Sequence, residues 1–395
     1  MMRTTATALC ALLALMAAGT ANAQQQCGGD LASWIAGVEA EASAQGVGQT
    51  GFSALEHAKL DQRVINRDRG QAVFTQTFAE FAGRMINSYR LQHGAANLKK
   101  YAGTFARAER EFGVPGPVIA SFWALETDFG AVQGDFRTLD ALTTLAHDCR
   151  RPEIFRPQLI ALLKLIDQGT VPADVQGAWA GEIGQMQMLP TDYLEKGVDG
   201  DEDGRVDLRG SAPDAILTAA NKLASLGWQA GQPWMEDVVV PDKLPWEQTG
   251  RVQKRPRSQW AGWGVTYREG KPLPADAMPA ALVLPMGHKG PAFLVYDNYD
   301  IYLEWNKSLV YTLTAAHLAA RLAGAPAFDP RNPEPGLAPE AMKLLQQKLA
   351  DRGYDVGNID GVLGAGTRDA VRQEQLRLGF PADGWPTPAL LTNLQ

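Results

Sequence analysis

The stretch VIASFWALETDFG, residues 118–130, decides how the chain folds around it. It follows a Pro-Gly-Pro turn, a natural helix start, and its apolar residues recur at spacings of three and four. Phe122, Trp123 and Glu126 therefore share one face of a predicted helix. An apolar setting disfavours an ionised carboxyl, so we expect the pKa of Glu126 to rise toward that of a general acid working near neutral pH.

The same pattern also fits a structural role for Glu126. A carboxylate at the edge of a core is commonly paired to an arginine, and Arg137 or Arg150 would be the partner. On the pattern alone, this paired role is favoured over catalysis. Asp128, two residues further on, is expected to be exposed at the helix end.

The sequence lacks the motifs of several other catalytic sites. Its five histidines form no H-E-x-x-H pair, and neither a G-x-S-x-G elbow nor a G-x-x-x-x-G-K-[ST] phosphate loop occurs. This leaves carboxylate chemistry. Ten Trp residues could supply stacking surfaces for sugar rings, although most buried Trp belong to the core.

Composition excludes several classes of protein. The 395 residues are 45% hydrophobic and 21% charged, with a formal net charge of −7. These values argue against a disordered or collagen-like chain and against a nucleic-acid partner. The length predicts about two to three domains. One basic run is predicted to be a solvated loop, with contact to an acidic polymer as the alternative: Arg251, Lys254, Arg255 and Arg257.

The first 23 residues are predicted to be a secretory signal. Arg3 supplies the positive start, residues 6–18 form an apolar run too short to span a membrane, and Ala-Asn-Ala at 21–23 is a cleavage site. No later stretch reaches the roughly 18 apolar residues of a transmembrane helix. Three glutamines precede Cys27, which does not fit a lipidated cysteine. We therefore expect an exported, soluble protein without a lipid anchor.

Export changes the interpretation of the cysteines. The mature chain keeps Cys27 and Cys149, and in an oxidising compartment a disulfide between them is favoured. A nucleophilic Cys149 beside His147 and Asp148 is the weaker alternative, because neighbours in sequence rarely present a thiol and its base to each other.

Prolines divide the chain near residue 325. Five of them between residues 326 and 339 break helix and strand alike and favour an extended spacer. The block before the spacer is predicted to be mainly helical, from apolar positions at helical spacing in residues 61–84, 98–112, 118–129, 158–168, 214–226 and 312–323. Residues 281–284, 293–296 and 301–305 predict a small antiparallel sheet.

The segment VDGDEDGRVDL, which begins at Val198, is similar to a calcium loop. Its Gly at position 6 allows the sharp turn, and position 7 would ligate through its backbone carbonyl. Position 12 is Gly210, so Asp214 is a candidate substitute for the usual Glu. Close aspartates repel one another, so a structural calcium ion is favoured over a solvated turn. The expected ligand positions are Asp199, Asp201, Asp203, Arg205, Asp207 and Asp214.

Four segments together resemble the B-type lytic murein transglycosylases, glycoside hydrolase family 103. They are FWALETDFGAVQGDFRTLDALTTLA, AWAGEIGQMQMLPTDY, the aspartate loop followed by DAILTAANKLASLGW, and NYDIYLEWNKSLVYTLTAAHLAARL, and they span most of residues 30–325 in the family's order. The resemblance implies an α+β fold, with a lysozyme-like, mainly helical catalytic domain, a deep glycan groove and a small antiparallel sheet. It also implies one catalytic Glu, which by motif is Glu126, and this outweighs the paired role.

The resemblance further implies residues that contact the substrate. Gln187, Asn306 and Tyr311 match family positions, the last two near the catalytic carboxyl. Three positions depart from the family pattern, each by loss of a hydroxyl: Phe81 for Tyr, Ala178 for Ser and Trp305 for Tyr. Phe81 and Trp305 remain expected substrate contacts, but with fewer hydrogen bonds to the glycan or to Glu126.

Residues 339–395 resemble the common small peptidoglycan-binding domain, a short helical bundle. Apolar residues line its first helix and Thr367 can cap the second. Glu374 stands where an aromatic core residue is usual, which puts the packing of that helix in question. The predicted organisation is a signal at 1–23, a catalytic domain at 24–325, a Pro-rich linker at 326–338 and a peptidoglycan-binding domain at 339–395.

The expected function is that of a periplasmic lytic transglycosylase. It would cleave the β-1,4 bond between N-acetylmuramic acid and N-acetylglucosamine and close a 1,6-anhydro ring, with Glu126 as acid and then base and no catalytic cofactor. A hydrolytic muramidase, which needs a second carboxylate that does not stand out from the sequence, and a non-catalytic peptidoglycan-binding scaffold are the alternatives. Peptidoglycan strands are the expected partner, and envelope proteins are expected only by analogy.

Overall fold

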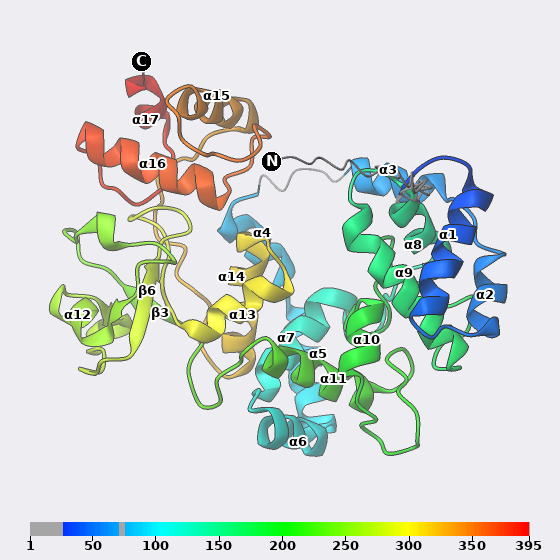
Figure 1. The fold of residues 1–395 in the computed structure, drawn as a ribbon. Coiled ribbons are helices and arrows are strands. Elements are labelled where there is room, and N and C mark those ends of the chain that lie inside the picture. Colours follow the sequence, from blue (N-terminus) through cyan, green and yellow to red (C-terminus); the bar gives the residue numbers. More distant parts are fainter. Residues whose placement is uncertain (1–26, 71–75, 395) are drawn as a thin grey trace, which may run out of the picture.

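Helix α7 (Gly116–Thr127) lies at the centre of the fold and carries the deciding stretch (Figure 1). The computed structural model describes residues 27–70 and 76–394, so the predicted signal at 1–23 lies outside the described residues. Apart from Pro117 and Glu126, every residue of α7 is buried. A helix that is buried on all sides must be enclosed. Four helices pack around it: α5 (Ser88–Lys100), α6 (Ala102–Phe112), α11 (Ala212–Ser225) and α14 (Leu309–Leu322).

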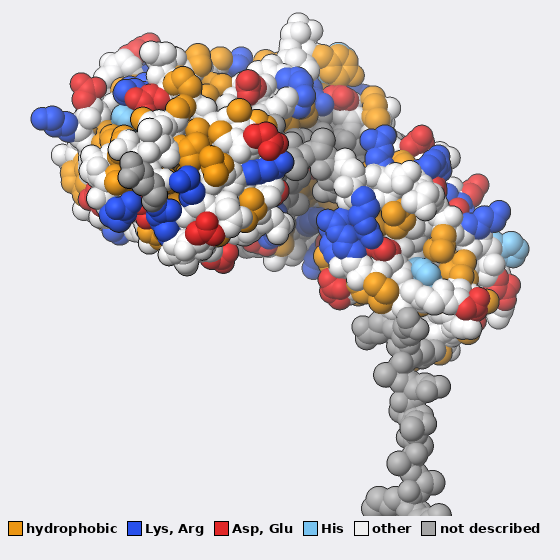
Figure 2. All heavy atoms as spheres, turned by 90° about the horizontal axis from the view of Figure 1, so that it is seen from above, with side chains coloured by type: hydrophobic (Ala, Val, Ile, Leu, Met, Phe, Trp, Pro, Cys, Tyr) orange, Lys and Arg blue, Asp and Glu red, His pale blue; other side chains and the backbone are white. Residues whose placement is uncertain are grey.

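A second group of helices stands to one side of α7, and from above it forms a separate lobe (Figures 1 and 2). Its elements are α1 (Leu31–Ala44), α2 (Gln49–Leu55), α3 (Gln62–Arg69), β1 (Phe136–Arg137), α8 (Thr138–His147), α9 (Pro152–Asp167), β2 (Gln176–Gly177) and α10 (Pro190–Lys196). Helix α9 is its core, because α1, α2, α8 and α10 all contact it. Within the described ranges, no helix is both long and apolar enough to cross a bilayer.

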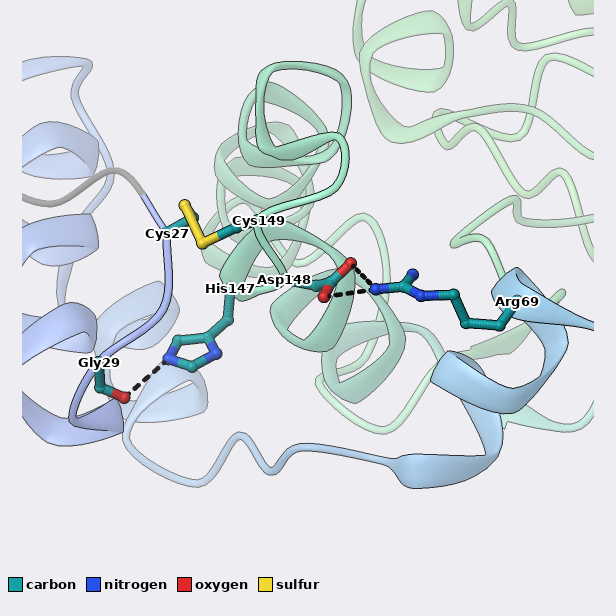
Figure 3. The surroundings of a disulfide bond; sticks show 6 residues. All are labelled: Cys27, Gly29, Arg69, His147, Asp148 and Cys149. Carbon is teal, nitrogen blue, oxygen red and sulfur yellow. Dashed lines mark hydrogen bonds and ion pairs between the residues drawn. A yellow bond between two sulfur atoms is a disulfide. The ribbon is translucent and has the colours of Figure 1, made fainter. Parts of the chain in front are cut away.

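A disulfide joins the start of the described chain to this lobe (Figure 3). Cys27 and Cys149 are bonded, with their Cα atoms 5.2 Å apart. The N–H of Gly28 also donates to the carbonyl of His147 at 2.7 Å, and the His147 ring bonds the carbonyl of Gly29. Cys149 is therefore not a free thiol, and the nucleophilic alternative is wrong.

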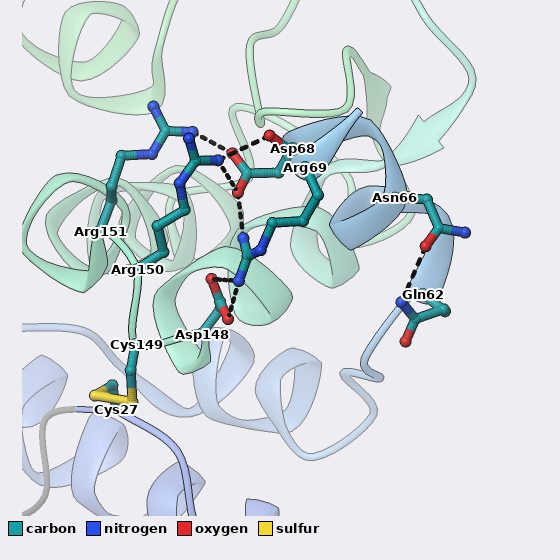
Figure 4. Close-up of polar contacts among 9 residues, drawn as sticks. All are labelled: Cys27, Gln62, Asn66, Asp68, Arg69, Asp148, Cys149, Arg150 and Arg151. Atoms are coloured by element: carbon teal, nitrogen blue, oxygen red, sulfur yellow. Dashed lines mark hydrogen bonds and ion pairs between the residues drawn. A yellow bond between two sulfur atoms is a disulfide. The ribbon is translucent and has the colours of Figure 1, made fainter. Parts of the chain in front are cut away.

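A cluster of charges around Asp68 lies beside the disulfide (Figure 4). Asp68 is only 2% exposed, and its carboxylate accepts hydrogen bonds from Arg69, Arg150 and Arg151. Arg69 continues the network to Asp148 at 2.9 Å. Burial disfavours the charged form, but the arginines hold the pKa of Asp68 below its ordinary value.

The opposite side of the molecule contains a five-stranded antiparallel sheet in the order β4-β6-β7-β3-β5. Its elements are β3 (Met235–Val239), β4 (Arg255–Pro256), α12 (Arg257–Gly262), β5 (Thr266–Tyr267), β6 (Pro279–Val283) and β7 (Ala292–Val295), with 3-10 turns at Trp246–Gln248 and Arg268–Gly270. In the central hairpin Leu282 pairs with Leu294. The predicted mainly helical fold with a small antiparallel sheet is confirmed.

Residues 301–305, predicted as a strand, instead end helix α13 (Asp297–Trp305). The apparent alternation covers only five residues. The buried residues of α13 also include Asn298, Tyr299 and Tyr302, and Tyr302 lies four and three residues after the other two, as on one face of a helix. Similarly, the single helix predicted at 61–84 is two elements, α3 and α4 (Phe78–Met85), and Thr77 starts α4 with a capping box.

The basic run is not a solvated loop, which corrects the sequence-based prediction. Lys254 bonds Asp297 at 2.5 Å and Asp300 at 2.8 Å. Arg257 is 8% exposed and pairs with Asp276. The run therefore joins the sheet to α13 and supports the packing of this side.

The C-terminal unit consists of α15 (Pro339–Ala350), α16 (Ala365–Leu378) and α17 (Pro388–Asn393) around a separate apolar core. Glu374 of α16 is 2% exposed. Burial opposes its ionisation, yet hydrogen bonds from Arg377 and Tyr354 hold its pKa below its ordinary value. The missing aromatic ring is thus replaced by a buried carboxylate that Arg377 pairs with from the surface.

The segment 326–338 has no helix or strand, as its prolines predict, but it is attached to the catalytic block. Phe328 packs 4.8 Å from Phe78, measured between ring centroids, and its N–H donates to the buried His317 ring at 3.2 Å. The N–H of Asn332 donates to the carbonyl of Lys289. The linker is therefore held against the catalytic block and is not a free, flexible connection.

Removing the disulfide is expected to lower the free energy of unfolding by about 2–5 kcal/mol, because it closes a long loop in the unfolded chain. Urea denaturation of the double variant Cys27→Ser, Cys149→Ser against the wild type measures this. Dithiothreitol should destabilise the wild type and leave the variant unchanged. Equal midpoints for both proteins under oxidising conditions would contradict the stabilising role.

Candidate active site

Glu126 projects from α7 toward the ends of α13 and α14. Its Oε1 accepts a hydrogen bond from the Tyr311 hydroxyl at 2.5 Å and another from the Trp305 indole N–H at 3.0 Å. Ser308 fixes Tyr311 by capping α14, because its side chain accepts the Tyr311 backbone N–H. Both donors reach the same oxygen, so Oε2 is the oxygen of Glu126 that can carry and deliver a proton.

The environment of Glu126 favours its neutral form. Burial is the main cause and raises its pKa, while the bonds from Tyr311 and Trp305 and the charge of Lys222 act in the opposite direction. Tyr311 has a pKa raised well above its ordinary value, first by burial and then by the charge of Glu126. It therefore stays a hydrogen-bond donor at neutral pH.

The paired role for Glu126 is wrong. Arg137 binds Asp140 at 3.0 Å, and Arg150 binds Asp68 at 2.6 Å. Among the described residues, no ion pair of Glu126 is found. A desolvated acid without an arginine partner is suited to general acid catalysis, because nothing stabilises its charged form as an ion pair would. Asp128 ends α7 with a left-handed backbone and binds Arg90 at 2.7 Å.

Trp305 compensates for the hydroxyl that the family pattern places at its position. The sequence predicts fewer hydrogen bonds to Glu126 there, but the indole N–H supplies one. The ring stacks on Phe122 at 4.4 Å between centroids, and the Lys222 ammonium lies 4.6 Å above it. The contacts with Phe122 and Lys222 hold the ring in place, with its N–H toward the carboxyl.

Glu182 is a second acid of the site that sequence reasoning missed. It lies on the loop between β2 and α10, and its Oε2 is buried with no hydrogen-bond partner among the described residues. Burial is the largest effect on the pKa of Glu182 and raises it. Hydrogen bonds from backbone N–H groups of its own loop lower this pKa, and the charge of Glu126 raises it. The second carboxylate that does not stand out from the sequence is therefore present in the structure, close enough for the charge of Glu126 to act on it. Its one signal in the sequence is that it is the only acidic residue of residues 178–190.

The other expected substrate contacts have structural partners. Gln187 has a left-handed backbone, with φ of 48°, and donates from Nε2 to the carbonyl of Gly184 at 2.9 Å. Asn306 accepts the Ser308 N–H at 3.0 Å, next to the Glu126 site. Phe81 is buried in α4. Their contacts with substrate stay predictions.

The aspartate loop brings three of its predicted ligands together. Oxygens of Asp199, Asp201 and Asp203 all lie within 4.8 Å of one another, a donor set suited to a hard cation. Asp214 instead organises the backbone, because it is 1% exposed and its two oxygens accept the N–H groups of residues 200, 201 and 207. Asp207 similarly accepts two N–H groups on Oδ1. Three carboxylates and the Arg205 carbonyl would leave water to complete the shell.

Comparisons with known proteins identify the family of the chain. The model of the family described as "Transglycosylase SLT domain" matches residues 30–320, and that of the "Putative peptidoglycan binding domain" matches residues 339–394. Among curated proteins, membrane-bound lytic murein transglycosylase B of Escherichia coli K12 is 29% identical over 242 residues, which cover 61% of this chain and 66% of that protein.

Solved structures extend the likeness over most of the chain. SltB3 of Pseudomonas aeruginosa in complex with NAG-anhNAM-pentapeptide is 36% identical with a TM-score of 0.85, over 93% of this chain and all of that one. Slt35 of Escherichia coli in complex with calcium is 27% identical with a TM-score of 0.62, over 75% and 96%. As the sequence motifs implied, this chain belongs to the SLT transglycosylase family and carries a peptidoglycan-binding domain after its catalytic block.

Proposed function

We propose that this protein is a lytic transglycosylase. It cleaves the β-1,4 bond between N-acetylmuramic acid and N-acetylglucosamine in peptidoglycan and leaves a 1,6-anhydro muramic end. The observation that carries the proposal is Glu126, a half-buried, desolvated acid whose Oε1 is held by Tyr311 and Trp305. The NAG-anhNAM ligand in SltB3 supports this type of product.

Glu126 acts twice in this mechanism. Its Oε2 first gives its proton to the glycosidic oxygen, and the bond from that oxygen to the muramic anomeric carbon breaks. The 2-acetamido group of the substrate stabilises the positive charge at that carbon. The ionised Glu126 is then stabilised by the Tyr311 and Trp305 donors, and it accepts the proton of the muramic C6 hydroxyl as that oxygen bonds to the anomeric carbon. Glu126 is thereby restored without water.

Because Glu182 is a second carboxylate at the site, hydrolysis is the main alternative to the proposed reaction. A muramidase would use a second, ionised carboxylate as a nucleophile or as a base toward water. Burial and the charge of Glu126 both raise the pKa of Glu182, which favours a neutral carboxyl with neither ability. A non-catalytic scaffold is disfavoured because it would have no use for a desolvated acid held by two donors.

We further propose that the enzyme works in the periplasm as a soluble protein without a lipid anchor. The signal pattern of residues 1–23 supports export, and the Cys27–Cys149 disulfide fits an oxidising compartment. Its partner is the peptidoglycan strand, which both the catalytic block and the C-terminal unit would bind. Envelope proteins that recruit it are a further expectation, supported by analogy alone.

Glu126→Gln is expected to bind sacculi with wild-type affinity and to lose at least about 10³-fold in turnover, because the amide has no proton to give. Release of soluble muropeptides from purified sacculi measures turnover, and co-sedimentation measures binding. Glu304→Gln, at an exposed residue of α13 that pairs with Lys307 rather than with a residue bonded to Glu126, is the matched control. Retained turnover in Glu126→Gln would mean that another group is the acid.

Glu182→Gln is expected to keep turnover within about tenfold and to leave the products unchanged, because a neutral amide replaces a neutral carboxyl of the same shape. Mass spectrometry of digested sacculi should show anhydro-muramic ends for the wild type and for the variant. Reducing muramic ends from the wild type, lost together with activity in Glu182→Gln, would establish the hydrolase instead.

We also propose that the aspartate loop binds a structural calcium ion through Asp199, Asp201, Asp203 and the carbonyl of Arg205. Their carboxylate oxygens are close enough to share one cation, and the calcium complex of Slt35 supports the choice of metal. Gly204, with φ of 89°, provides the sharp turn. The ion would hold the loop and take no part in the reaction.

Calcium at about 100 times its dissociation constant should stabilise the protein by about 2.7 kcal/mol. A thermal melt with CaCl2 should therefore lie above one with EGTA, and Asp201→Asn should abolish the difference. Asp242→Asn, an exposed aspartate outside the loop, should retain it. Identical melting temperatures of the wild type in CaCl2 and EGTA would rule out the site.

A further inference from the structure

Lys222 of α11 is a charged residue beside the acid site that has no part in the two proton transfers. Its side chain is 15% exposed, and its ammonium binds Oδ2 of Asp192, on α10, at 2.7 Å. The same nitrogen lies over the face of the Trp305 ring, 4.6 Å from its centroid. Helix α11 packs against both α10 and α7, which carries Glu126 (Figure 1). Contacts from α10 and α13 thus hold one cation of α11 in place.

These contacts form a continuous chain that ends at Glu126. Asp192 holds the ammonium, the ammonium lies over the indole, and the indole N–H donates to Oε1 of Glu126 at 3.0 Å. A cation over an aromatic face is attracted to the electrons of the ring and withdraws them from the N–H, which becomes a stronger donor. The gain is largest when the acceptor is a carboxylate, because hydrogen bonds to a charged acceptor are the stronger ones.

Other titratable and charged groups surround Glu126. Tyr311 of α14 donates to the same oxygen, and Glu182, on the loop before α10, is the second acid of the site. Arg90 of α5 pairs with Asp128 at the end of α7. The described ion pairs of α6 join its residues to one another and to the aspartate loop. Burial raises the pKa of Glu126, whereas the bonds from Tyr311 and the indole, and then the charge of the α11 ammonium, lower it.

We propose that Lys222 is a positioning residue of the reaction, which holds and polarises the Trp305 indole so that its N–H stabilises Glu126 while this acid is ionised. Glu126 loses its proton in the first step and recovers it in the second, so it is charged only between the two. A donor that acts more strongly on the ionised acid than on the neutral one lowers the barrier between them. This inference rests on the proposed function for the two proton transfers.

The pH dependence of kcat/KM tests the charge of Lys222. The substrate is a soluble oligomer of N-acetylglucosamine and N-acetylmuramic acid, and loss of the intact oligomer gives the rate. Activity requires the protonated acid, so it is lost as the pH rises through the pKa of Glu126. Lys222→Met removes a charge that lowers this pKa, so the loss of activity should move to higher pH. Asp192→Asn leaves the ammonium less balanced and should move it to lower pH, while Lys222→Arg should resemble the wild type.

A double-mutant cycle in the same assay tests whether Lys222 acts through the indole. Lys222→Met should lower kcat about tenfold, because a desolvated cation over a ring contributes enough for that change, and it should leave KM nearly unchanged. In a Trp305→Phe protein, which keeps a ring but has no N–H, the same substitution should lower kcat less than about twofold. Lys243→Met, at an exposed lysine, is the matched control and should keep the wild-type kcat.

Three outcomes would overturn the role of Lys222. The first is an unchanged kcat in Lys222→Met. The second is an equal loss of kcat with and without the Trp305 N–H, since Lys222 would then act by another route. The third is a shift of the pH dependence in the same direction for Lys222→Met and Asp192→Asn, as loosened packing would produce. The proposed function fails separately: products with reducing muramic ends would refute the transglycosylase, while a loss of kcat that depends on the indole would still support Lys222.

Discussion

The desolvation of Glu126 is the constraint on which the rest of the structure depends. A carboxyl shielded from water is costly unless it is neutral or satisfied. Here Tyr311 and Trp305 satisfy one oxygen, while burial raises the pKa of Glu126 and so favours a proton on the other oxygen. This arrangement requires α7 to be enclosed, because a helix that could shift would admit water. The burial of ten of its twelve residues meets that requirement, and it explains why helices from distant parts of the chain converge on α7.

Lys222 connects the acid site to its surroundings. Its ammonium binds Asp192 of α10 at 2.7 Å and lies over the Trp305 ring, and its charge lowers the pKa of both Glu126 and Glu182. One fixed cation near two acids with raised pKa values suits a reaction in which one of them becomes ionised midway. The cation is neutralised by Asp192 rather than by Glu126, so it does not hold the acid in its charged form before substrate arrives.

The sequence could reveal Glu126 because its signals are local: helical spacing within thirteen residues and a motif around it. Glu182 could not be found this way, since its burial and its interaction with Glu126 arise only when the loop before α10 folds against α7. The prediction of a solvated loop for the basic run was wrong for the same reason. Asp297 and Asp300, which neutralise Lys254, lie more than forty residues away in the chain. The prediction of a strand at residues 301–305 was wrong for a different reason, because five residues are too few to distinguish a strand period from a helix period.

The C-terminal unit shows how an attached domain can act without free motion. A flexible linker would raise the effective concentration of wall near the catalytic block. Instead, Phe328 is inserted among aromatic rings of that block, and Trp385 lies so close to Gly287 that a Cβ there would be 2.9 Å from the Cβ of Trp385. His288 and Asp383 add a hydrogen bond across the same contact. A unit fixed in this way presents its binding surface at a set position relative to Glu126. It would therefore determine the direction in which a glycan strand enters the groove, rather than raise the effective concentration of the strand.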